Sequence, residues 1–472
     1  MKKKYLAVLC LLFFSLFQAQ NVLSQEGESE DLQWSVSGTG FGKSVLHGLI
    51  AAGEIQASNW LVTLINLSYG APWALPTEET LRRNFTGDWK WEETDGYKVN
   101  QFGHPIQGAM YHGAARANGF NYYESLFFSV FGSFTWESFG EGQQMAYNDF
   151  IVAPIGALSM GEMLYRLYLE ACAAGFPAPV AAFINPMVGF HRLVSGWEPP
   201  NYGSNLQLFQ VSIGGGYAQT HSSISPDEKE VFSFQGPVGE LGFSIIYGNP
   251  FEQNSRVPYD HFELYVTLGM DGGNYNNIRF ISDGYLFSFS PFHSEKSMFS
   301  TGLSLHFDFI SLGKFDMYDS TVDQSSYALD WTIKYQYLFT ENVSFQTKFH
   351  AGFTFFGASE YYHPNHSKGK KDIKNYGYGF NSKLYVNLEL GKLGRLDTNA
   401  FFYVLWSYPG TSALSYGTVY WLFADVTYNF FFTKHFSVGI ADCFSFERGL
   451  FGNFPDTQKY NNLVKLFAAW SF

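Results

Sequence analysis

Cysteine and charge are both scarce in this chain. It has 3 cysteines in 472 residues, and Cys10 lies in the N-terminal apolar run, so only Cys172 and Cys443 remain elsewhere. That number excludes a disulfide scaffold and leaves at most one bridge. Charged residues make up 15% of the chain, against about 25% in an ordinary soluble domain. The net charge of −13 excludes nucleic acid as an expected partner, because that partner requires a basic surface.

Long apolar helices are also missing beyond the N-terminal run. A transmembrane helix needs about 20 residues with few or no charges. One candidate stretch is interrupted by Glu54 and Asn59, and another by Glu162, Arg166 and Glu170. Aromatic residues, in contrast, make up 19% of the chain. So many rings with so few charges indicate that part of the surface faces something other than water.

The N-terminus has the three parts of a secretory signal peptide. Lysines at positions 2–4 precede an apolar run at 6–17, and small and polar residues follow, with Ala19 and Ser24 as candidate cleavage sites. We therefore expect residues 1–24 to be a signal peptide and the rest of the chain to be exported.

The C-terminus has the pattern of a strand that ends on an aromatic residue. Val464, Leu466 and Ala468 alternate with other residues, and this period of two is typical of a half-buried strand. Trp470 and the terminal Phe472 continue the alternation and resemble the C-terminal assembly signal of bacterial outer-membrane barrels. We therefore expect the barrel-assembly machinery to recognise this end.

The same alternation recurs from about residue 205 onward. Between 343 and 357, odd positions such as Phe345 and Phe349 are apolar, whereas even positions such as Lys348 and His350 are polar. One face of such a strand would meet lipid and the other a wet lumen. We predict strands at 205–219, 230–247, 258–270, 276–290, 296–311, 323–338, 342–357, 374–390, 394–407, 414–432, 434–447 and 459–472.

These strands predict an antiparallel transmembrane β-barrel over residues 204–472. The connections after the sixth, eighth and tenth strands are short, and those after the seventh, ninth and eleventh are long and polar, as periplasmic turns and extracellular loops are. The long connection at 248–258 leaves ten or fourteen strands as alternatives to twelve. A soluble sandwich is disfavoured, because its outward positions would not be so uniformly Phe, Leu and Val. The predicted lumen-facing side chains are Asp308, Asp330, Lys334, Lys348, His350, Lys383 and Glu389.

Residues 25–200 form a predicted domain of four to five helices. Small residues recur at spacings of three and four, as Gly108 and Ala115 do, and these spacings let helices approach closely. Such a domain could fill the barrel as a plug, cap it from the periplasm or lie at the membrane edge. We therefore expect the chain to be an α+β membrane protein, with a helical domain followed by a β-barrel. The predicted helices are 43–68, 105–118, 122–140, 154–174 and 179–193.

Five motifs in the helical half carry a family resemblance. They are "NQFGHPIQGAMYHGAARANGF" at 100–120, "GSFTWESFGE" at 132–141, "NDF" at 148–150, "PIGALSMGEMLYRL" at 154–167 and "INPMVGFHRLVSG" at 184–196. Over about residues 40–200, the chain resembles a family of bacterial outer-membrane proteins defined only as a domain of unknown function. The resemblance implies an outer-membrane location and this architecture, and it implies no activity.

These motifs contain an unusual set of ionisable residues. The pattern places Glu137 and Glu141 one turn apart on one face, and Glu162 and Arg166 as a favourable i,i+4 pair. Carboxylates that converge with His104 could bind zinc or calcium, or serve as general acid and base. No spacing matches a known metal or catalytic motif, so we favour a packing network. Glu137→Gln should then cost about 1–3 kcal/mol without changing bound ions. The full set is His104, His112, Arg116, Glu137, Glu141, Asp149, Glu162, Arg166, His191 and Arg192.

The sequence predicts a plugged or gated channel or binding barrel for small polar solutes in the bacterial outer membrane. Its expected partners are outer-membrane lipid and the assembly machinery, and no cofactor is expected. One alternative is a membrane-embedded enzyme that acts on envelope lipid or glycan through His104, Glu137, Glu141, Glu162 and Arg166. A structural role in envelope assembly is the other. The pattern leaves metal binding, oligomeric state and the identity of any solute open.

Overall fold

The computed structural model describes residues 41–91, 96–200, 204–224, 229–251, 254–271, 276–313, 322–362, 372–411, 416–453 and 455–472. The expected signal peptide lies outside these residues. The chain divides into two compact units. Of the described residues, those before residue 94 and those at 103–204 form the helical unit, and those at 96–102 and from 205 onward form the barrel unit. Residues 96–102, which the sequence placed with the helices, thus group with the barrel.

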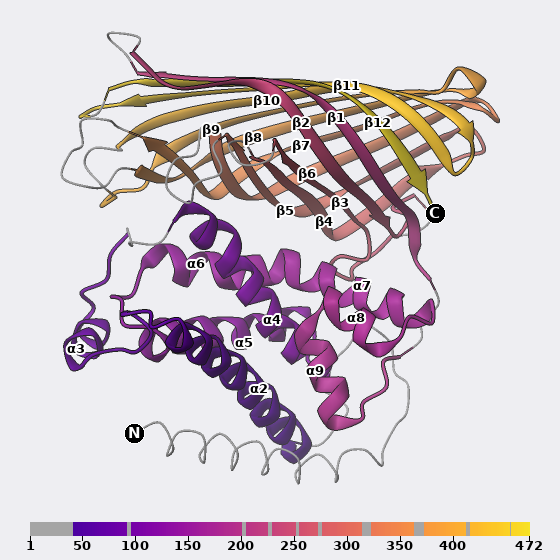
Figure 1. Ribbon diagram of the computed structural model, residues 1–472. Helices are drawn as coiled ribbons and strands as arrows, with labels where there is room; N and C mark the ends of the chain where they lie inside the picture. Colours follow the sequence, from indigo (N-terminus) through magenta and orange to yellow (C-terminus); the bar gives the residue numbers. More distant parts are fainter. Residues whose placement is uncertain are drawn as a thin grey trace. The chain divides into compact units, whose positions relative to one another are not determined.

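The helical unit contains every helix that the sequence predicted, with some divisions and one addition (Figure 1). The expected helix at 154–174 begins earlier, at Tyr147, and the one at 179–193 is divided before Pro186. The short helix α3 was not predicted. The described helices are α2 (Phe41–Ser68), α3 (Glu78–Thr86), α4 (His104–Ala117), α5 (Tyr122–Thr135), α6 (Tyr147–Gly156), α7 (Glu162–Ala173), α8 (Ala178–Ile184) and α9 (Pro186–Ser195), with π-helical segments η2 (Val99–Gly103), η3 (Trp136–Gly140) and η4 (Ala157–Gly161).

Local sequence signals explain where several of these helices begin. Asn121 caps α5, and its side chain and that of Glu124 form a reciprocal capping box. Asn185 caps α9, whose first residue is Pro186. By length and composition, one described helical stretch, Tyr147–Ala173, is apolar enough to cross a membrane. Of its apolar window, 67% is buried, as in the core helix of a folded domain.

Helix α4 packs closely against its neighbours through glycine. A Cβ atom added at Gly108 would lie 1.8 Å from the carbonyl oxygen of Ala153 in α6. One added at Gly161 would lie 2.7 Å from the Cβ atom of His112, and one at Gly132 in α5 would lie 2.6 Å from the ring of Tyr111. Gly108, Gly132 and Gly161, each in one of the motifs, therefore allow close helix–helix contact, as the recurrence of small residues predicted.

The barrel unit is a closed antiparallel sheet of twelve strands, each paired with its neighbours in sequence (Figure 1). The first and last strands close it, with Tyr217 opposite Val464. This result confirms the predicted count over ten or fourteen. The strands are β1 (Leu206–Ile224), β2 (Lys229–Tyr247), β3 (Phe262–Met270), β4 (Asn276–His293), β5 (Ser297–Gly313), β6 (Val322–Thr340), β7 (Val343–Tyr362), β8 (Asp372–Leu390), β9 (Arg395–Ser407), β10 (Gly417–Thr433), β11 (Phe436–Phe451) and β12 (Thr457–Ser471).

The wall of the barrel has a polar and an apolar side, as the alternation requires. In β6 the side chain of Trp331 is 46% exposed, whereas its neighbours Asp330 and Thr332 are fully buried. In β12 Leu466 is 66% exposed. Because successive side chains of a strand point to opposite faces, the exposed apolar set forms the outer wall and the buried polar set the interior.

Part of the outer wall is covered by chain from outside the strands. Tyr259, from the long β2–β3 connection, donates a hydrogen bond from its hydroxyl to the carbonyl of Leu305 (3.3 Å). The Phe102 ring lies 5.0 Å from that of Phe309, and Tyr97 donates to the carbonyl of Ala358 (2.9 Å). Phe309 follows the interior residue Asp308 in β5, so it faces outward. Residues 96–102 therefore lie along the outer wall.

Candidate functional site

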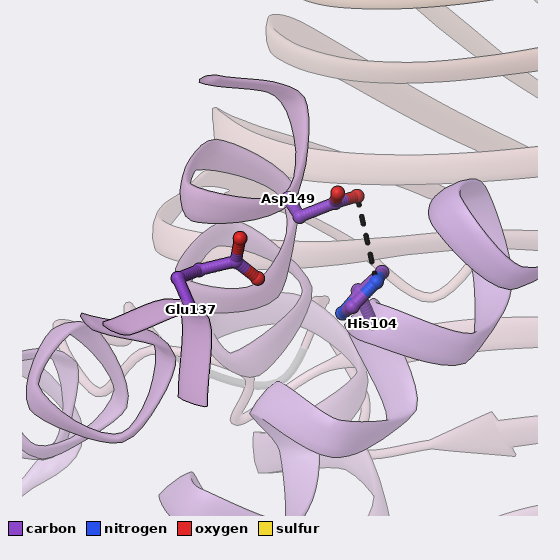
Figure 2. Close-up of side chains that lie close together, drawn as sticks. All are labelled: His104, Glu137 and Asp149. Atoms are coloured by element: carbon purple, nitrogen blue, oxygen red, sulfur yellow. Dashed lines mark ion pairs between the residues drawn. The ribbon is translucent and has the colours of Figure 1, made fainter. Parts of the chain in front are cut away.

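Three buried side chains of the helical unit converge at a point where a metal ion could be held. His104, Glu137 and Asp149 each offer a ligand atom, and these atoms all lie within 4.8 Å of one another. Figure 2 shows the three side chains pointing toward one another from separate segments. The Nε2 atom of His104 lies 3.6 Å from Oδ1 of Asp149. The sequence named His104 and Glu137 as candidates, and it named Asp149 only within the wider ionisable set.

Irregular helical geometry places two of these residues. His104 begins α4 directly after the π-helical segment η2, and Glu137 is the second residue of η3. Asp149 lies in the first turn of α6. Single π-helical turns are rare in proteins and occur often at functional sites.

A chain of amide hydrogen bonds orients the His104 ring. Asn59 donates its side-chain amide to the carbonyl of Gly132 (3.2 Å), which fixes its Oδ1 atom as an acceptor. Gln107 donates to that Oδ1 atom (3.4 Å), so its own Oε1 atom faces Nδ1 of His104 at 3.3 Å. Because Gln107 Oε1 can only accept, His104 donates from Nδ1. In the neutral ring, Nε2 then carries the lone pair.

Hydrogen bonds hold the backbone and the carboxylate of Glu137 and the carboxylate of Asp149. Asn84 donates to the backbone carbonyl of Glu137 (3.1 Å), and the backbone N–H of Ala146 donates to the carboxylate oxygen Oε2 of Glu137 (3.4 Å). Asn148 donates to Oδ1 of Asp149 (2.6 Å). Such contacts fix the direction in which a carboxylate points, as groups around a ligand set do.

Glu141 departs from the predicted geometry. The helical segment η3 ends at Gly140, and Glu141 has extended backbone, with φ −143° and ψ 162°. The i,i+4 relation to Glu137 on one helical face is therefore wrong, because a residue outside the helix does not follow its periodicity. Glu141 is buried, but it is not in the group formed by His104, Glu137 and Asp149.

The other predicted ionisable residues form a separate network around Glu162. Arg166 lies 3.0 Å from this carboxylate as the predicted i,i+4 pair, and Arg116 and His112 each lie 2.9 Å from it. Burial alone would raise the pKa of Glu162, but the two arginines and the His112 hydrogen bond outweigh burial and lower it well below its usual range. Burial lowers the pKa of His112. This group is a fully buried ion-pair cluster of the kind that the packing interpretation predicted.

A third buried pair joins Glu54 of α2 to His191 of α9, with Nδ1 of His191 2.8 Å from Oε1 of Glu54. Asn118 donates to the other oxygen of Glu54 (2.8 Å). The sequence marked Glu54 only as an interruption of an apolar stretch, and no local spacing joins it to a residue 137 positions later. Arg192 pairs instead with the exposed Glu198.

The barrel interior holds the charges that the alternation pointed inward. Lys383 of β8 lies 2.5 Å from Asp308 of β5, and Lys348 of β7 lies 2.8 Å from Asp283 of β4. These strands are not neighbours in the barrel. The side chains can therefore meet only across the interior.

Further partners complete this interior layer. Glu263 of β3 lies 2.9 Å from Lys334 and 2.8 Å from Lys348, and His306 lies 3.5 Å from Asp330. The sequence candidates omitted Glu263, Asp283 and His306. Position parity in the strand would have identified His306, since it lies two residues before Asp308.

A polar cavity of about 670 Å³ lies on one side of the charged layer. Its lining comes from the ends of strands that meet the short turns, such as Ser344 in β7 and Glu389 in β8. Four cationic and four acidic side chains are among the lining residues, so their formal charges balance. They are Lys334, Lys348, Arg395, Lys465, Glu263, Glu389, Asp397 and Asp425.

Toward the long-loop ends of the strands, an apolar and aromatic cluster fills part of the interior, beside the buried ion pair of Glu447 and Lys459 (3.2 Å). Ile310 and Leu312 continue the inward face of β5 beyond Asp308 and belong to one buried cluster with aromatic residues of β9 and β10. Trp421 is its largest member and is 1% exposed. The cluster comprises Ile281, Ile310, Leu312, Phe401, Tyr403, Trp421 and Phe423. Charged side chains thus fill the interior at mid-height, and rings together with a further ion pair fill it toward the long loops.

A family model matches part of the helical unit. Residues 88–186 match the family described as Domain of unknown function (DUF3943). This match confirms the resemblance drawn from the motifs. A search of curated proteins gives no match.

Several solved structures are similar to the barrel at low sequence identity. The COG4313 outer membrane channel from Pseudomonas putida F1 is 10% identical with a TM-score of 0.29, and the alignment covers 58% of this chain and 100% of that one. The toluene transporter TodX from the same species is 8% identical with a TM-score of 0.24, over 56% and 89%. The NanC porin is 6% identical with a TM-score of 0.23, over 54% and 98%. The closed strand order of the chain itself, and not these scores, establishes its barrel.

Proposed function

We propose that this protein is a gated outer-membrane barrel that binds a small polar solute in its interior. The observation that carries the proposal is the polar cavity, which is bounded by a layer of ion pairs and then by the aromatic cluster. The exposed apolar wall and the aromatic C-terminus support the outer-membrane location. The arrangement of short turns and long loops supports a periplasmic position for the cavity.

The balance of charge in the cavity suggests the chemical class of the solute. Four cationic and four acidic side chains line it. A solute with a net charge would meet equal numbers of attractive and repulsive groups, whereas a zwitterion or a neutral polar molecule could satisfy both. The volume of about 670 Å³ lies in the range of small-molecule sites, which is about 300–1,000 Å³.

The closed state of the interior can be tested by conductance of the full-length protein in planar bilayers. We expect low conductance, because rings and ion pairs fill the section beyond the cavity. Trp421→Ala should raise conductance by opening the aromatic cluster. Trp331→Ala is the matched control, because Trp331 lies on the outer wall and its loss should leave conductance unchanged.

Two results would contradict the proposal. A wide open pore in the unmodified protein would exclude a closed interior. Equal conductance of the Trp421→Ala variant and the parent, with both inserted in the bilayer, would show that the cluster is not the barrier.

The enzyme alternative has less structural support than the barrel. It required His104, Glu137, Glu141 and Glu162 to act together. Glu162 already lies against Arg116, Arg166 and His112. A carboxylate held by two arginines is a poor general base, because the cations stabilise its charged form.

A further inference from the structure

We propose that His104, Glu137 and Asp149 bind a divalent transition-metal ion in the helical unit. This site is separate from the solute-binding barrel, and the argument for it does not depend on the function proposed above. It rests on the convergence of the three ligand atoms, the orientation of the His104 ring, and the burial of two acidic groups side by side.

The spacing of the ligand atoms fits one ion. Zinc lies about 2.0–2.2 Å from nitrogen and oxygen ligands, so two ligands of a tetrahedral ion lie about 3.4 Å apart. Nε2 of His104 and Oδ1 of Asp149 are separated by 3.6 Å, and the whole set fits within 4.8 Å. A separation of 3.6 Å is long for a direct hydrogen bond, but it suits two ligands of a shared cation.

The hydrogen-bond chain behind His104 presents the correct nitrogen. Gly132, Asn59 and Gln107 together require Nδ1 of His104 to donate. Nε2 therefore offers its lone pair toward the carboxylates, and this buried atom has no hydrogen-bond partner among the described residues. Metal-bound histidines in proteins characteristically donate their other ring nitrogen to a neighbouring acceptor in this way.

Burial of the two carboxylates favours a bound cation. Glu137 is 1% exposed and Asp149 is fully buried. Two like charges this close in a site from which water is excluded repel each other, and one of them must take up a proton or share a cation. A metal ion binds the lone pair of His104 and neutralises both carboxylates. A single proton neutralises only one of the two acids.

The donor set selects the class of metal. Calcium and magnesium prefer oxygen ligands alone, whereas imidazole with carboxylates suits zinc, manganese or iron. Three protein ligands leave a coordination position that water can fill, as in catalytic rather than closed structural zinc sites. We therefore keep the packing-network interpretation for the Glu162 cluster and replace it with a metal site for the His104 group.

The first test is elemental analysis of the full-length protein, purified without chelators. We expect about one equivalent of zinc or manganese in the parent, and less than about a tenth of that in His104→Gln and in Asp149→Asn, which remove ligands. His191→Gln is the matched control. It also removes a buried histidine paired with a carboxylate in the helical unit, and it should keep the metal.

A second test works even if a ligand variant fails to fold. Chelator-treated parent protein is titrated with Co²⁺, and visible absorption bands should saturate at one equivalent and disappear when Zn²⁺ is added. Gln107→Met leaves the ligands in place and should weaken Co²⁺ binding by about 10–100-fold, because it frees the ring of His104.

The outcomes separate the two explanations of the cluster. Metal in the parent and in His191→Gln, with loss in the ligand variants, supports the site. Absence of metal together with no response to Co²⁺ would overturn it and leave His104 and Asp149 as a buried packing contact. Retention of metal in both ligand variants would also overturn it, since the ion would then lie elsewhere.

Discussion

At the scale of single residues, the buried charges of the helical unit form separate groups that differ in their balance of acidic and basic side chains. Glu162 has two arginines and a histidine beside it. The His104 group has one basic ring and two acids. The first is balanced by its own side chains, and the second gains from an added cation. The sequence alone could not assign these buried acids to different roles. The side chains around each acid distinguish them.

Glu162→Gln should strongly destabilise the helical unit. The change leaves Arg116 and Arg166 buried beside a neutral amide, and removal of one partner from a buried ion pair costs about 3–5 kcal/mol. Thermal melting followed by circular dichroism in detergent would measure the loss.

The matched control for that variant is Glu79→Gln in α3. Glu79 also pairs with two arginines, Arg82 and Arg83, but all three are solvent-exposed. Because water screens exposed pairs, the control should melt with the parent. Equal melting of the Glu162 variant and the parent would show that the buried cluster adds nothing to stability.

The sequence could identify the ionisable residues but not their grouping. Glu162 and Arg166 are four residues apart in a helix, and this local spacing predicted their contact. His104 and Asp149 lie on helices separated by α5 and η3. Their meeting depends on how three helices pack, and no local pattern encodes that arrangement.

At the scale of elements, strands were predicted more accurately than helices. A period of two is easily recognised in a barrel strand, because every second side chain faces lipid. The predicted β9 at 394–407 differs from Arg395–Ser407 by one residue. The third strand was predicted to begin at 258, but it begins at Phe262. Residues 254–261 instead lie over β4, where Ser255 bridges Ser288.

The helix boundaries were predicted less accurately, because π-helical turns interrupt the period of 3.6 residues. The predicted helix at 122–140 consists of α5 followed by η3. A π-helical turn inserts an extra residue per turn, so the face that a later side chain occupies shifts. The predicted relation between Glu137 and Glu141 failed because η3 ends at Gly140 and Glu141 has extended backbone.

Close packing of α4 can be tested with a matched pair of glycine variants. Gly108→Ala should destabilise the helical unit by about 1–3 kcal/mol, the usual cost of overpacking, because its Cβ atom would overlap the Ala153 carbonyl. Gly48→Ala in α2 should be neutral or stabilising, since its Cβ atom would make only ordinary contacts at 3.7 Å. Thermal melting of both variants would decide, and an unchanged Gly108→Ala protein would contradict the close contact.

At the scale of the whole molecule, the C-terminus closes the barrel. Phe472 is 74% exposed, and its backbone N–H donates to the carbonyl of Phe209 in β1 (2.8 Å). Trp470 is also on the outer side, beside the ring of Phe436. The same strand thus completes the sheet and displays its rings.

Deletion of Phe472 should give an exported protein that fails to insert into the outer membrane. The truncated strand loses its terminal hydrogen bonds to β1 and the aromatic side chain expected to be recognised during assembly. Heat-modifiable migration of outer-membrane fractions on gels would measure insertion. A normal level of the heat-modifiable form would show that this residue is not part of an assembly signal.

The outer-wall segment at 96–102 makes the barrel unit discontinuous in sequence. Lys98 donates to Asn276 (3.2 Å), and Ser325 donates to Gln101 (2.9 Å). Without this segment, the Oδ1 atom of Asn276 and the hydroxyl of Ser325 would lose these partners on the outer wall, which is costly in contact with lipid. The barrel therefore cannot be excised as one continuous piece of chain: a fragment starting near residue 204 would contain all twelve strands and still lack part of its own surface.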